Sequence, residues 1–116
     1  MRHVLYRVQL ATLVLVFGGG VAMAASAEKG QAAYMKYGCW GCHGTVGQGA
    51  VTGPKLGPDP MPAETFNAFV RTTNRAMPPY RAEVLPDDDL ADIYAYLQGV
   101  PKAADHKSIP LLTQLP

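Results

Sequence analysis

Hydrophobic residues recur at helical spacing in three segments of the chain. These segments cover residues 28–37, 62–72 and 86–98. The third has the clearest stripe, because apolar side chains recur every three or four positions. Its members are Leu90, Ile93, Tyr94 and Leu97. Each segment is long enough for a helix, and none alternates apolar and polar residues as a half-buried strand does. The pattern therefore predicts an all-α fold with three main helices.

Residues at the ends of these segments support the assignment. Three aspartates at 87–89 favour the positive end of a helix dipole at the start of the last segment. Gly99 and Pro101 then end that helix, and Gly38 ends the first one. The intervening residues 44–60 are rich in glycine and proline, which predicts a structured loop.

The first 27 residues follow another pattern. Arg2 and Arg7 precede an apolar run over residues 10–17, and small residues follow. Two small-residue patterns typical of secretory signal cleavage end at Ala24 and Ala27, and we expect cleavage after Ala27. The apolar run is shorter than the ~20 residues of a spanning helix, so a membrane tether would require an uncleaved signal. We therefore expect an exported protein, most simply a periplasmic one.

Composition narrows the possible partners and the possible core. The full chain has 116 residues, with ten basic and nine acidic ones. Loss of Arg2 and Arg7 with the signal leaves a near-neutral domain, which favours neither nucleic acid nor a polybasic membrane contact. The remaining ~90 residues can build only a thin core, so a cofactor is expected to complete it.

The candidate chemistry lies in one short motif. The chain has two cysteines, Cys39 and Cys42, and they are followed directly by His43. This C-x-x-C-H spacing is the attachment signature of haem c. Two thiols three residues apart on a helical turn reach both vinyl groups of the porphyrin. The adjacent imidazole can then coordinate the iron.

The cysteine pair has two other possible interpretations. A thiol–disulfide redox pair shares the C-x-x-C spacing, but it usually lies in a βαβ setting that this sequence does not predict. A zinc site needs more ligands, and outside the signal only His106 remains among further histidines and cysteines. His106 itself is expected to be a surface residue. Haem attachment is therefore the favoured interpretation.

A methionine downstream is the candidate for the second axial ligand. Met77 precedes Pro78 and Pro79, whose rings stiffen the backbone and disfavour a helix. A thioether held on a rigid loop is a suitable ligand for haem iron opposite a histidine. The alternative is that Met77 only packs in the core. Met35 and Met61 are weaker candidates.

In these motifs and their order, the sequence resembles the monohaem class I cytochrome c family. The resemblance spans nearly the whole mature chain and implies a small fold of three main helices around one haem c. It implies that the Pro54 carbonyl accepts a hydrogen bond from His43 and that Leu56 lines the haem pocket. It also implies that Gly30 and Tyr34 meet the last helix near Tyr94 and Leu97. Finally, it implies that either Arg71 or Arg75 pairs with a haem propionate.

The expected function is transfer of single electrons by an iron that His43 and Met77 ligate. Expected partners are redox proteins, such as a dehydrogenase donor and an oxidase or other acceptor, with no nucleic acid. The protein is expected to be a monomer or a subunit of a redox complex, and not an enzyme. Arginines near the Met77 loop are candidates for partner contact: Arg71, Arg75 and Arg81. A haem enzyme or gas binder with an open sixth position is a further alternative.

The predicted organisation has three parts. Residues 1–27 form the signal peptide, residues 28–99 the cytochrome c domain, and residues 100–116 a C-terminal tail with prolines and leucines. Whether the tail docks on the domain, docks on a partner or stays mobile is left open by the sequence.

Overall fold

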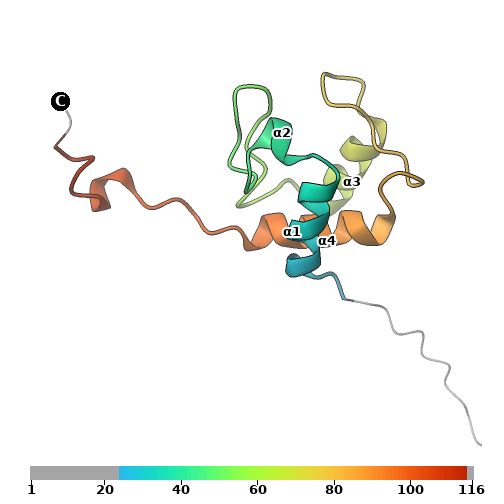
Figure 1. The fold of residues 1–116 in the computed structure, drawn as a ribbon, viewed down its shortest axis with the longest axis horizontal. Coiled ribbons are helices and arrows are strands. Elements are labelled where there is room, and N and C mark those ends of the chain that lie inside the picture. Colours follow the sequence, from blue (N-terminus) through green and yellow to red (C-terminus); the bar gives the residue numbers. More distant parts are fainter. Residues whose placement is uncertain (1–23, 115–116) are drawn as a thin grey trace, which may run out of the picture.

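A computed structural model describes residues 24–114 of the chain (Figure 1). It contains four α-helices and one 3₁₀ turn, and no strand is assigned within this range. The elements are α1 (Ala27–Lys36), α2 (Trp40–His43), α3 (Ala63–Thr72), α4 (Asp87–Gly99) and a 3₁₀ turn (His106–Ser108). The all-α prediction is confirmed, and each of the three predicted helices begins and ends within one residue of its prediction.

Of the predicted signal peptide, residues 1–27, the first 23 residues lie outside the described part of the chain. In the part of the chain that is described, no helix is both long and apolar enough to cross a membrane.

Helices α1 and α4 cross in direct backbone contact (Figure 1). A Cβ atom placed on Gly30 would lie 1.9 Å from the Asp92 carbonyl oxygen and 2.8 Å from the Tyr96 Cβ. Glycine is therefore required for this crossing. The close approach also brings the rings of Tyr34 and Tyr96 within 5.6 Å, centroid to centroid.

Gly30 and Tyr34 meet α4 as expected, but their neighbours there are Asp92 and Tyr96, not Tyr94. Tyr94 instead packs on Phe66 of α3, with ring centroids 5.3 Å apart. Residues two positions apart on an α-helix point about 200° apart, so Tyr94 faces α3 whereas Tyr96 faces α1. The apolar stripe in the sequence identified the helix but not which tyrosine faces α1.

Hydrogen bonds fix both ends of α1. Ser26 caps its start, where the hydroxyl accepts from the Lys29 backbone N–H, and the Ser26 N–H donates to buried Asp92 over 2.5 Å. At the other end Gly38 has φ +77°, the left-handed conformation in which a glycine commonly ends a helix. Beside it the Tyr37 hydroxyl donates to Asp89 at the start of α4. These bonds fix α1 relative to α4, and both helices contribute residues to the functional site.

The core is small and lies between α1, α3 and α4. Its most buried side chains, each 2% exposed or less, are Tyr34, Leu85, Ile93 and Leu97. Three of them, Tyr34, Leu85 and Ile93, also line a cavity beside this cluster.

The C-terminal tail extends away from the helices (Figure 1). Every residue from 101 to 114 is exposed, including Leu111 and Leu112. An ion pair between Lys102 and Asp59, 3.2 Å apart, joins the tail to the domain, and both of these side chains are exposed. His106 is on the surface, as expected.

Candidate functional site

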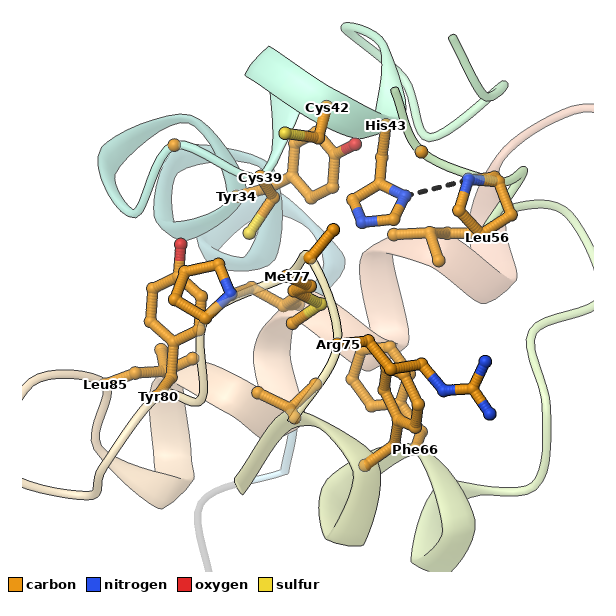
Figure 2. A pocket seen from close by; sticks show the side chains of 18 of the residues that line it. Tyr34, Cys39, Cys42, His43, Leu56, Phe66, Arg75, Met77, Tyr80 and Leu85 are labelled. Carbon is orange, nitrogen blue, oxygen red and sulfur yellow. Dashed lines mark hydrogen bonds between the residues drawn. The ribbon is translucent and has the colours of Figure 1, made fainter. Parts of the chain in front are cut away.

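The short helix α2 carries the motif that the sequence singled out. Cys39 is its N-cap residue, already in helical conformation at φ −56° and ψ −36°, so Cys39 and Cys42 lie one helical turn apart. Both cysteines are free thiols and both line the cavity below α2 (Figure 2). Trp40 lies between them and is half exposed. The motif thus presents two sulfur atoms along one rim of the cavity.

Tyr34 holds the end of this turn in place. Its ring is fully buried, and its hydroxyl donates to the Gly44 carbonyl over 2.7 Å. Gly44 itself has φ +80°, which directs the chain away directly after His43. Burial raises the pKa of the Tyr34 hydroxyl well above its usual range, and the hydroxyl therefore stays a protonated donor.

His43 is oriented by a carbonyl on the following loop. Its side chain is buried, and Nδ1 lies 2.8 Å from the Pro54 carbonyl oxygen. With Nδ1 donating to that carbonyl, the other ring nitrogen is the free acceptor and points into the cavity (Figure 2). Such an arrangement fixes both the tautomer and the direction of a metal-binding imidazole.

Gly53 makes this orientation possible, a role that the sequence did not predict. A Cβ at Gly53 would lie 2.6 Å from the Cys42 carbonyl oxygen and 2.9 Å from His43 Nδ1. Only glycine lets the loop approach the imidazole closely enough for the Pro54 carbonyl to accept a hydrogen bond from it. The one signal in the sequence was that this glycine directly precedes Pro54, the proline expected to accept a hydrogen bond from His43.

The cavity has a volume of about 640 Å³, within the ~300–1,000 Å³ of typical cofactor sites. Its walls are mainly apolar and come from every helix and from both long loops. Leu56 lines it, as expected, together with Phe66, Val70, Leu85, Leu90 and Ile93. A flat apolar cofactor with polar groups at one edge suits such a space.

Met77 lines the cavity from the loop between α3 and α4 (Figure 2). Tyr80 anchors this loop, because its N–H donates to the Val70 carbonyl of α3 over 2.9 Å. The Tyr80 hydroxyl donates to the Tyr37 carbonyl, also over 2.9 Å, close to the cysteine motif. Burial raises the pKa of this hydroxyl and keeps it a donor. One side chain thus joins the Met77 loop to the segment that leads into α2.

The two candidate arginines have different surroundings. Arg71 is mostly buried and donates to two backbone carbonyls and to Asp87. Arg75 is exposed at the edge of the cavity (Figure 2), and within residues 24–114 its guanidinium has no hydrogen-bond partner. Of the two, Arg75 is available for an anionic group of a bound cofactor.

The electrostatics of Cys39 differ from those of a thiol redox centre. Burial raises the pKa of its thiol above the usual value of a cysteine, whereas reactive C-x-x-C cysteines have a lowered pKa. Cys39 is therefore a protonated thiol at neutral pH, with its S–H intact. Such a thiol can add across a vinyl group without any change of oxidation state.

Two thiols at one rim, an oriented imidazole and an apolar cavity fit one group, haem c. This combination defines the class: a small helical protein with one covalently bound haem. Arg75, the arginine among the lining residues that the structure describes, suits an anionic group at the edge of such a cofactor.

The comparisons with known proteins agree. Residues 25–97 match the family model described as cytochrome C oxidase, cbb3-type, subunit III. The chain is also 31% identical over 97 residues to cytochrome c-555 of Methylococcus capsulatus, covering 77% of this chain and 79% of that protein. No solved structure matches significantly. The chain belongs to the cytochrome c family, as a class I cytochrome c, and serves as a haem-based electron carrier.

Proposed function

We propose that this protein shuttles single electrons between exported redox proteins, with His43 and Met77 as axial ligands of its haem. The observation that carries the proposal is the placement of both side chains in one cavity (Figure 2). His43 enters from α2, and Met77 enters from the loop between α3 and α4. Nitrogen and thioether donors from two separate segments are the usual way to fill both axial positions of a cytochrome c.

The surrounding residues suit electron transfer better than catalysis. A bound haem c supplies one-electron chemistry between ferric and ferrous iron. His43 and Met77 together would leave no iron position for a substrate. Cys42 is exposed where it lines the cavity, so a partner can approach the cofactor edge there. Exchange through such an edge requires only a small and brief interface.

The test is the visible spectrum of the ferric holoprotein. We expect the weak far-red band that methionine ligation produces, and we expect Met77→Ala to abolish it. Met35→Ala is the matched control, since Met35 is exposed on α1 and lies outside the cavity. Carbon monoxide should bind the reduced M77A protein and not the wild type. A wild type without the band would instead favour a haem enzyme or gas binder.

A second candidate function is a fixed subunit of an oxidase or dehydrogenase complex. The matching family model is described as an oxidase subunit, and the tail exposes Leu111 and Leu112. Cell fractionation distinguishes the two functions. A free shuttle is released with the soluble periplasmic fraction, whereas a subunit co-purifies with its complex.

For the partner surface we propose Arg75 and Arg81, which are exposed beside the Met77 loop. Local positive charge speeds encounter with an acidic partner, so the rate of electron exchange should fall as salt rises. Arg71 suits this role poorly, because its side chain is only 19% exposed and already paired.

We also propose export to the periplasm, with removal of a signal peptide. Cleavage after Ala27 stays the expectation from sequence, but Ser26 caps α1 and binds Asp92. The site after Ala24 would keep both contacts. The intact mass of the mature holoprotein distinguishes cleavage after Ala24 from cleavage after Ala27, since the two products differ by three residues.

A further inference from the structure

We propose that Arg71 is a positioning residue that holds Met77 at its place in the cavity. The proposal rests on the ligation by Met77 proposed above. The Arg71 side chain lies at the end of α3, where one guanidinium nitrogen donates to the Tyr80 carbonyl over 2.9 Å. The same nitrogen donates to the Leu85 carbonyl over 2.7 Å. One side chain thus holds two points of the chain that follows Met77.

An acidic residue fixes the guanidinium in turn. The second nitrogen of Arg71 lies 2.5 Å from an Asp87 carboxylate oxygen, at the first residue of α4. Arg71 therefore ties α3, the Met77 loop and α4 together. Leu85 is almost fully buried, so its carbonyl lies in a region where an unpaired acceptor is costly.

Tyr80 transmits this restraint to Met77. Both backbone polar groups of Tyr80 are bonded at α3, the N–H to Val70 and the carbonyl to Arg71. Only Pro78 and Pro79 separate Tyr80 from Met77, and proline rings fix φ at both positions. A shift of Tyr80 would therefore move Met77 with it.

The upstream side of the loop is held more weakly. The last short bond there joins the Thr73 N–H to the Phe69 carbonyl over 2.9 Å, four residues before Met77. Beyond it, the Arg75 N–H donates to the buried Thr73 hydroxyl over 3.3 Å. The restraint on Met77 thus depends mainly on the downstream bonds. Lysine cannot replace arginine here, because one ammonium lacks the planar fork that reaches two carbonyls and a carboxylate.

The experiment measures how often Met77 leaves the iron. Imidazole added to the ferric holoprotein can bind only after Met77 dissociates, so at high imidazole the binding rate equals the dissociation rate. We expect Arg71→Lys to raise that limiting rate at least about tenfold, since a bond from a charged donor is lost. Glu83→Gln is the control, an exposed charged residue of the same segment, and should keep the wild-type rate.

A second variant covers the case in which R71K does not accumulate as holoprotein. Asp87→Asn removes only the exposed carboxylate that holds the guanidinium, and we expect a rise of about two- to fivefold. Wild-type rates in R71K, or in D87N where R71K fails to mature, would overturn the role of Arg71. A wild type that lacks the far-red band before imidazole is added would overturn the ligation itself, and the two failures are thus distinguishable.

Discussion

Single hydrogen bonds determine how the haem-binding turn is held. The Tyr34 hydroxyl donates to the Gly44 carbonyl, and the Pro54 carbonyl accepts a hydrogen bond from His43 Nδ1–H. Each bond joins α2 to a segment that the haem alone would not fix. Their loss should therefore be measurable even though the thioether links remain.

The pH dependence of stability tests the Tyr34 bond. Burial raises the folded-state pKa of Tyr34 above the ~10 of an unfolded tyrosine, so its contribution is complete below pH 10 and is lost above it. We expect Tyr34→Phe to lower the free energy of unfolding by about 1 kcal/mol at pH 8. Above pH 10 the wild type alone loses about 1.4 kcal/mol per pH unit from this group, so the two should converge near pH ~11. Urea unfolding of both holoproteins measures this, and a gap that stays constant with pH would contradict it.

At the residue scale, the sequence predicted the features that depend only on residues close together in the chain. The spacing of Cys39, Cys42 and His43 specifies an attachment site without any tertiary information. The roles of Gly53 and Arg71 depend on which carbonyl or ring lies opposite, and only the folded chain brings those groups together. Hydrogen bonds to distant carbonyls leave no residue pattern in a single sequence.

Helix boundaries were predictable because their signals are local. Gly38 ends α1, and three aspartates occupy the first turn of α4. The rotation of α4 against α1 was not predictable from its apolar stripe. It depends on Gly30, where the two backbones touch and Tyr96 becomes the neighbour of Tyr34.

Gly30→Ala tests this crossing. The new methyl group would overlap the Asp92 carbonyl, so α1 and α4 must separate. We expect the free energy of unfolding to fall by about 2–3 kcal/mol, because overpacking outweighs the better helix propensity of alanine.

Gly99→Ala is the matched control for that prediction. A Cβ at Gly99, the last residue of α4, meets nothing within 4 Å. This variant should stay within about 0.5 kcal/mol of wild type. Equal stabilities of G30A and G99A in urea unfolding would show that the crossing tolerates a side chain.

For the whole molecule, the arrangement of the core explains why a cofactor was expected. The buried cluster packs along one side of a cavity of about 640 Å³, and bound haem would supply the opposite wall. Chain length and composition predicted this need for a cofactor. They could not predict the direction of the tail. An exposed segment does not pack on the domain, so its sequence carries no periodic pattern of apolar residues.

Removal of residues 103–116 tests whether the tail belongs to the folded unit. Residues 103–114 are exposed, and the nearby Lys102–Asp59 ion pair would remain. We expect the free energy of unfolding to change by no more than about 0.5 kcal/mol. A loss above ~1.5 kcal/mol in urea unfolding would mean that the tail packs on the domain.

The position of Trp40 has a practical consequence. It is the single tryptophan of the chain, and it lies between the two cysteines that attach the cofactor. Excitation energy of an indole this close to a porphyrin passes to the porphyrin instead of being emitted as light. Because the thioether links persist in the denatured chain, fluorescence should stay quenched even after unfolding. Emission from this protein would therefore count the chains that never received their cofactor.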